Sequence, residues 1–79
     1  MTTDSEYNMG FEFETLDAET KAEVMMVVEI TAEDHRARSI RWRNGDVYAH
    51  PHADGISWGV NGGEHGFCIA RGIGIPKTS

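Results

Sequence analysis

The chain lacks the paired cysteines that stabilise small secreted domains and the long apolar segments that anchor proteins in membranes. Its single cysteine, Cys68, cannot form an internal disulfide, and this usage favours a reducing compartment. The longest apolar run, from Val24 to Val28, is far shorter than the roughly 18 residues of a membrane helix. The polar start, MTTDSEYNMG, predicts neither a signal peptide nor an anchor. We therefore expect a cytoplasmic protein.

Enzyme motifs are also lacking. A chain of 79 residues makes one domain with a thin core, which disfavours a large buried active site. No nucleophile elbow surrounds a serine, the stretch GVNGGEHG lacks the lysine and hydroxyl of a phosphate loop, and RGIGIP matches no dinucleotide fingerprint. We expect no catalytic residues, no cofactor and no metal.

What the chain does have is a strong asymmetry of charge. Residues 1–34 contain ten acidic side chains against a single lysine, a formal charge of −9. From residue 35 onward six basic side chains face three acidic ones, a formal charge of +3. Such asymmetry points to electrostatically steered partners, although a solvated acidic surface that serves solubility is the simpler alternative.

The pattern of apolar residues predicts a mostly β fold, with α+β as the alternative. We expect one domain over residues 10–75, between flexible tails at 1–9 and 76–79. Its architecture would be an antiparallel meander of five or six short strands, forming a half-open sheet or a small barrel. Eight glycines between residues 45 and 74 argue against a helix in that part of the chain.

The first half of the domain allows two interpretations. Phe11 and Phe13 alternate with Glu12 and Glu14, which is typical of a strand. From residue 21 to 33 every even position is apolar, and this favours a second strand. A helix near residues 18–30 is the rival, because Asp17 is a suitable N-cap, and a short helix near residues 32–38 is a further alternative.

The pattern of the second half predicts β-hairpins. In SIRWRNGDVYAH the pair Asn44-Gly45 predicts a two-residue type I′ turn, so that Arg43 opposes Asp46 and Trp42 opposes Val47. A turn from Pro51 to Gly55 follows. Further strands then come at residues 56–60, 65–71 and 73–75, with a turn at residues 61–63.

The histidines and the cysteine raise the questions of metal binding and nucleophilic catalysis. His50, His52, His65 and Cys68 are all residue types that zinc accepts, but Pro51 and strand alternation separate them, so we do not assign them as ligands. Cys68 and Ser57, each paired with a histidine, are weak candidate nucleophiles. The simpler interpretation makes the histidines exposed and Cys68 a small buried hydrophobe.

Two alternative functions have some support. Arg41, Arg43 and Tyr48 form a secondary candidate surface for nucleic acid, because arginines follow phosphates and aromatic rings stack on bases. The overall acidity opposes direct binding to that polyanion. A structural or assembly module, such as a virion or toxin–antitoxin component, would instead self-associate as a homodimer through an edge strand or through Trp42 and Trp58.

The acidic residues of the first half provide the preferred hypothesis. In the strand and helix interpretations alike, we expect them to line one side of the molecule and to bind a basic protein surface, such as that of a nucleic-acid-binding effector. The predicted partner-binding residues are Glu12, Glu14, Asp17, Glu19, Glu23, Glu29, Glu33 and Asp34. In size, acidity and lack of enzymatic motifs, the chain resembles phage-encoded inhibitors of host defence nucleases, anti-CRISPR proteins among them. That resemblance, which is one of type and covers no motif, implies action in the host cytoplasm.

Overall fold

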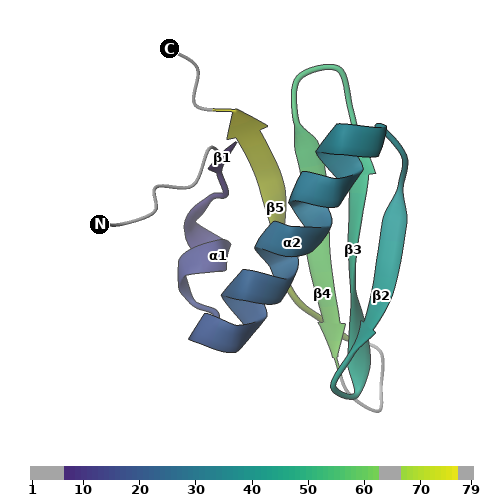
Figure 1. Ribbon diagram of the computed structural model, residues 1–79. Helices are drawn as coiled ribbons and strands as arrows, with labels where there is room; N and C mark the ends of the chain where they lie inside the picture. Colours follow the sequence, from purple (N-terminus) through teal and green to yellow (C-terminus); the bar gives the residue numbers. More distant parts are fainter. Residues whose placement is uncertain (1–6, 63–66, 77–79) are drawn as a thin grey trace.

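The computed structural model describes residues 7–62 and 67–76. An open five-stranded antiparallel sheet, in the order β1-β5-β4-β3-β2, has both helices on one face (Figure 1). The elements are β1 (Tyr7–Asn8), α1 (Phe11–Glu14), α2 (Ala18–Asp34), β2 (Arg38–Trp42), β3 (Gly45–Pro51), β4 (Ile56–Gly62) and β5 (Phe67–Pro76). The expected mostly β antiparallel meander is therefore confirmed as a half-open sheet, and of the alternatives for the first half the helix near residues 18–30 is the one present.

The prediction of a strand over residues 21–33 is wrong, because this segment belongs to α2. Asp17 caps the helix by accepting a hydrogen bond from the backbone N–H of Thr20 at 3.0 Å. The buried side chains follow a helical period, and they are Thr20, Val24, Val27, Val28 and Thr31. Two of these five are threonines, while Met26 on the opposite side is 43% exposed. The apolar residues at even positions therefore match the period of a strand although the segment is helical.

The strand expected for the stretch GFEFETL, residues 10–16, is also wrong, since Phe11–Glu14 forms the single turn of α1. Phe13 is buried and meets the ring of Trp58 edge to face, at 5.8 Å between centroids. Phe11 is 76% exposed, so the two phenylalanines do not share a core face. Gly10, with a positive φ of 91°, turns the chain from β1 into α1.

Residues 7–9, which the sequence pattern assigns to an N-terminal tail, take part in the described fold. Tyr7 and Asn8 pair with Pro76 and Ile75 at the edge of β5. Met9 is buried, and its carbonyl accepts a hydrogen bond from the indole nitrogen of Trp58 at 3.2 Å. The last residues of the predicted N-terminal tail therefore help to cover the core.

The core lies between α2 and the helix-facing side of the sheet. Along the strands it consists of Val47, Ala49, Ile56, Trp58, Val60 and Ala70. The opposite side of the sheet has no layer over it among the described residues (Figure 1). Hence the domain has an acidic helical layer and a separate open sheet face.

The β2–β3 hairpin turns one residue earlier than predicted. Trp42 pairs with Gly45, so the turn residues are Arg43 and Asn44, and Arg43 takes the positive φ of 54°. Gly45 is needed within the strand, because a Cβ there would lie 1.8 Å from the carbonyl oxygen of Asn61. The shift preserves the faces, so Ile40, Trp42, Val47 and Ala49 still point to the same side, as expected.

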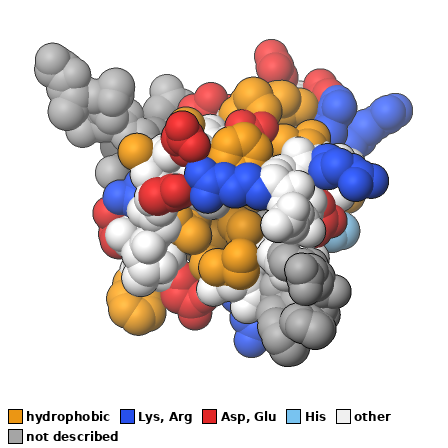
Figure 2. Space-filling model, turned by 90° about the horizontal axis from the view of Figure 1, so that it is seen from below, with side chains coloured by type: hydrophobic (Ala, Val, Ile, Leu, Met, Phe, Trp, Pro, Cys, Tyr) orange, Lys and Arg blue, Asp and Glu red, His pale blue; other side chains and the backbone are white. Residues whose placement is uncertain are grey.

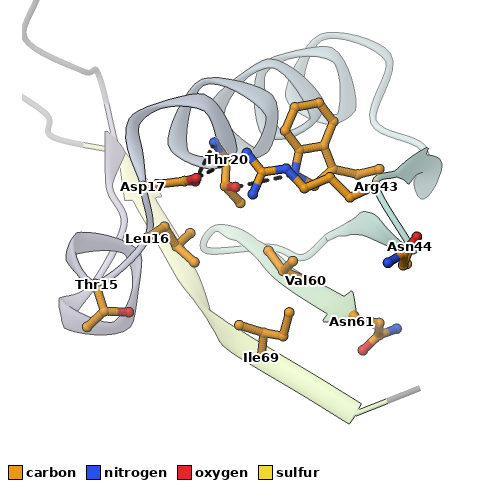
Figure 3. Close-up of a pocket in the computed structure, with 12 residues that line it drawn as sticks. Thr15, Leu16, Asp17, Thr20, Arg43, Asn44, Val60, Asn61 and Ile69 are labelled. Carbon is orange, nitrogen blue, oxygen red and sulfur yellow. Dashed lines mark hydrogen bonds and ion pairs between the residues drawn. The ribbon is translucent and has the colours of Figure 1, made fainter. Parts of the chain in front are cut away.

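A bulge in the β4–β5 pairing overturns the regular alternation expected for β5. Between Val60 and Asn61 the register shifts, so Ala70 pairs with Val60 whereas Cys68 pairs with Asn61. Ile69 is the extra residue, and it lies on the helix side of the sheet with Val60, as Figure 3 shows. The turn expected from Pro51 to Gly55 is present over residues 52–55, closed by a hydrogen bond from the His52 N–H to the Gly55 carbonyl at 2.8 Å, while Pro51 itself belongs to β3.

Candidate functional site

The eight predicted partner-binding acids all lie in or next to the helical layer. They belong to α1, to α2 and to the residue that caps α2. Because both helices cover the same face of the sheet, these carboxylates are carried on one side of the domain (Figure 1). Five of the eight are engaged within the chain, however, and this leaves a smaller acidic surface than their number suggests.

The engaged acids hold the two layers together. Arg43, in the β2–β3 turn, donates to Asp17 at 3.0 Å and to Glu19 at 2.9 Å. Arg38 at the start of β2 pairs with Asp34 at the end of α2. Within the helical layer, Lys21 pairs with Glu14 at 3.2 Å.

Glu12 makes a hydrogen bond to the sheet: its carboxylate accepts from the backbone N–H of Arg71 at 3.0 Å. That N–H lies on the edge of β5 beyond its pairing with β4 and would otherwise be open to another strand. A side chain from α1 thus caps this edge of the sheet.

The remaining acids form what we call the acidic ridge, namely Glu23, Glu29 and Glu33 of α2. None of the three makes an ion pair with another described residue. Glu29 and Glu33 are exposed and lie four residues apart, so they share one side of the helix, while Glu23 is half-buried on a neighbouring side. Ala22 and Met26 are exposed beside them and add a small apolar strip.

The acid that caps α2 is electrostatically the most perturbed. Hydrogen bonds from Thr20, and then the guanidinium of Arg43, lower the pKa of Asp17 from 3.8 to about 2. Asp17 and Glu19 in turn raise the pKa of Arg43 above its ordinary value. Asp17 and Arg43 therefore remain charged together around neutral pH.

An apolar pocket opens beside this ion cluster. It has a volume of about 370 Å³ and lies between the start of α2, the β2–β3 turn and the ends of β4 and β5. Figure 3 shows Leu16, Val60 and Ile69 pointing into it, with Arg43 and Thr20 above and Asn44 and Asn61 on one side. Viewed from below, a blue basic side chain lies beside red acidic ones, with orange apolar side chains above and below it (Figure 2).

No protein-family model, no curated protein and no solved structure matches the chain. Functional conclusions therefore depend on the geometry and the chemistry of the described side chains.

The secondary candidate surface for nucleic acid is divided. Tyr48 lies on the open face of the sheet over Gly59, where a Cβ would be 2.3 Å from the tyrosine oxygen. Arg41 shares that face, opposite Asp46 in the neighbouring strand. Arg43 points instead to the start of α2 and stacks over Trp42, with its guanidinium carbon 5.0 Å from the ring centroid. The three predicted residues thus do not form one cluster.

The histidines and Cys68 do not converge either. His52 Nε2 is 2.9 Å from Ser57 Oγ, whereas His50 meets the ring of Tyr48 at 6.0 Å between centroids. Cys68 is exposed, which corrects the expectation of a buried cysteine. His65 lies outside the described residues. Within residues 7–62 and 67–76, no group of three or more histidine, cysteine or acidic side chains is arranged to hold a metal ion.

The aromatic surface expected for self-association does not form. Trp58 is only 1% exposed, and Trp42 is half-buried against α2. The edge strand β2 is open, but Arg38 and Arg41 project from it, and such charges discourage strand addition. In the part of the chain that the structure describes, no helix is long and apolar enough to cross a membrane.

Sequence reasoning missed the pocket altogether. The sequence gives Leu16 no role and predicts Trp42 only on the apolar face of its hairpin, and a regular strand at residues 65–71 would place Ile69 on the same face as Arg71. The glycines around residue 62 were a sign of a bulge, but no residue type indicated which strand carried the extra residue. Without that position, the faces of β5 cannot be assigned.

Proposed function

We propose that this chain is a small acidic binding protein, with no catalytic role, that docks its helical layer on a basic protein that handles nucleic acids. The observation that carries the proposal is the separation of charge between the layers. Asp17 and the residues of α1 and α2 include eight acids and one lysine. Residues 35–62 and 67–76 include five arginines and only two acids. A surface with charge of one sign accelerates the encounter with a partner of opposite charge and helps to select that partner.

The acidic ridge supports this orientation of binding. Its carboxylates are not neutralised within the described chain, so they remain available to lysine and arginine side chains of a partner. Met26, 43% exposed among them, offers an adaptable apolar contact. A polar rim around an apolar contact is the usual arrangement of a protein interface.

The class of partner follows from the same charge. Proteins that bind nucleic acids carry a basic surface of lysine and arginine that neutralises phosphates. An acidic protein can occupy this basic surface in place of the nucleic acid. Direct binding of nucleic acid to the helical layer is opposed by like charge. We assign the chain to the functional class of small cytoplasmic inhibitors to which phage-encoded anti-CRISPR proteins belong.

The experiment compares three immobilised baits in a cell lysate. These are the wild type, the ridge variant Glu29→Lys with Glu33→Lys, and a sheet-side control, Asp46→Lys with Asp54→Lys. Both variants change the net charge by the same amount, so a difference between them reports position and not total charge. We expect basic nucleic-acid-binding proteins to be retained by the wild type and the control, and released by the ridge variant.

Two results would contradict the proposal. One is equal retention by the ridge variant, and the other is a set of retained proteins that is not enriched in basic ones. A mass by light scattering near twice 8.8 kDa, with binding unaffected by the ridge changes, would favour the assembly alternative.

A further inference from the structure

One rim of the pocket carries engaged acidic side chains. Asp17 lines the pocket and Glu19 lies near it, and both bind the single guanidinium of Arg43. Two carboxylates facing one cation leave this rim with an excess negative charge. Ile69, which lines the same pocket, presents an apolar side chain that is 61% exposed.

We propose that the pocket receives a large apolar side chain of the partner, with a lysine or arginine beside it in the partner's sequence bound by Asp17 or Glu19. This inference deepens the proposed function and depends on it for the identity of the partner. The docking segment of the partner is therefore an apolar side chain flanked by lysine or arginine.

The size and lining of the pocket fit such an anchor. Its volume of about 370 Å³ lies near the lower end of pockets that hold organic groups, about 300–1,000 Å³. Leu16, Val60 and Ile69 supply apolar contact, while the amides of Asn44 and Asn61 can donate to and accept from a partner's backbone. Anchors of this kind, buried in a pocket within a polar rim, contribute most of the free energy at many interfaces.

Charge complementarity distinguishes this occupant from a second copy of the chain. The most exposed large apolar side chain in the described residues is Phe11. It is followed by Glu12 and has Glu14 in the same helical turn, so its insertion would bring carboxylates toward Asp17 and Glu19. Like charges at short distance oppose that contact. A basic segment meets no such repulsion.

The test is a titration followed by NMR, because the chain contains only two tryptophans and therefore two indole N–H signals. Trp42 lines the pocket, whereas the indole of Trp58 is buried against Met9. The probes are three capped peptides, GKLKG, GELEG and GKSKG. We expect GKLKG to shift the Trp42 signal, to leave the Trp58 signal in place, and to bind more tightly than the other two.

A matched pair of variants tests the pocket itself. Ile69→Ser removes an exposed apolar side chain from the pocket, and Ile73→Ser makes the same change on the same strand but outside it, where Ile73 is 52% exposed. We expect the first to weaken GKLKG binding at least about tenfold and the second to change it less than about twofold. Circular dichroism and urea unfolding of both variants show whether either change disturbs the fold.

Three outcomes would overturn the inference. These are equal affinity for GKLKG and GKSKG, unchanged GKLKG binding by Ile69→Ser, and a Trp42 signal that moves with protein concentration and stops moving in Phe11→Ser. The last would identify a second copy as the occupant. Failure of the proposed function is a different result, namely lysate capture that survives Glu29→Lys with Glu33→Lys.

Discussion

The indole nitrogen of Trp42 donates a hydrogen bond of 3.3 Å to the hydroxyl oxygen of Thr20, which lies 22 residues earlier in the chain. This contact ties the last residue of β2 to the first turn of α2. Asp17 accepts the backbone N–H of the same threonine and binds Arg43, the neighbour of Trp42. The start of α2 and the β2–β3 turn are therefore held as one unit, and this unit forms the roof of the pocket.

Thr20→Val removes the hydroxyl that accepts from the Trp42 indole and that also hydrogen-bonds Asp17, while keeping the shape of the side chain. The indole N–H is then left without its partner, and we expect the free energy of unfolding to fall by about 1 kcal/mol. Urea unfolding followed by tryptophan fluorescence measures the loss. An unchanged midpoint would show that this contact between β2 and α2 contributes nothing to stability.

Thr31→Val makes the same chemical change with the opposite result. The hydroxyl of Thr31 is buried and has no hydrogen-bond partner in the described part of the chain. Replacing it with a methyl group ends the cost of desolvating that hydroxyl, so the free energy of unfolding should rise by about 1 kcal/mol. The two valine variants are compared in the same urea titration, and destabilisation by both would contradict this account.

His35→Gly should stabilise the end of α2. His35 is the C-cap and adopts the left-handed region, with φ 56° and ψ 44°, which is costly for a residue with a Cβ. We expect a gain of about 0.5–1 kcal/mol in thermal or urea unfolding, net of the greater freedom of glycine in the unfolded chain. The control is His50→Gly in β3, where glycine should weaken the strand.

Acid should weaken the cap of α2 within a defined pH range. The pKa of Asp17 is about 2 in the folded chain against an ordinary value of 3.8, so the unfolded state binds its proton first as the pH falls. The contribution of Asp17 to stability is therefore complete above about pH 4 and is lost between about pH 4 and pH 2.

The comparison protein for this prediction is Asp17→Asn, which keeps an N-cap side chain but does not titrate there. The stability of the wild type relative to this variant should shrink over that pH range, as measured by urea midpoints. A difference that stays constant down to about pH 2 would contradict the assigned pKa.

The sheet was largely predictable from sequence because its signals are local. Turn residues and the alternation of Ile56, Trp58 and Val60 indicate strands and faces without knowledge of the rest of the fold. The placement of Gly45 within β3 was not predictable, because it depends on the approach of Asn61 from another strand. Tertiary contact therefore moved the turn by one residue.

The helical layer was harder to predict. Burial of Thr20 and Thr31 and exposure of Met26 make the sequence of α2 look like a strand, and only packing against the sheet selects the helical face. The list of acids was a prediction from composition, and it could not show that Arg43 and Arg38 would engage Asp17, Glu19 and Asp34. Such pairs depend on how the layers dock.

The most direct measurement of the central claim is the affinity of an isolated captured partner for the wild type and for the two charge variants, at low and at high salt. We predict that Glu29→Lys with Glu33→Lys weakens binding about tenfold or more at low salt, that Asp46→Lys with Asp54→Lys does not, and that salt removes most of the difference. Equal affinities for both variants at low salt would contradict the assignment of the helical layer as the binding surface.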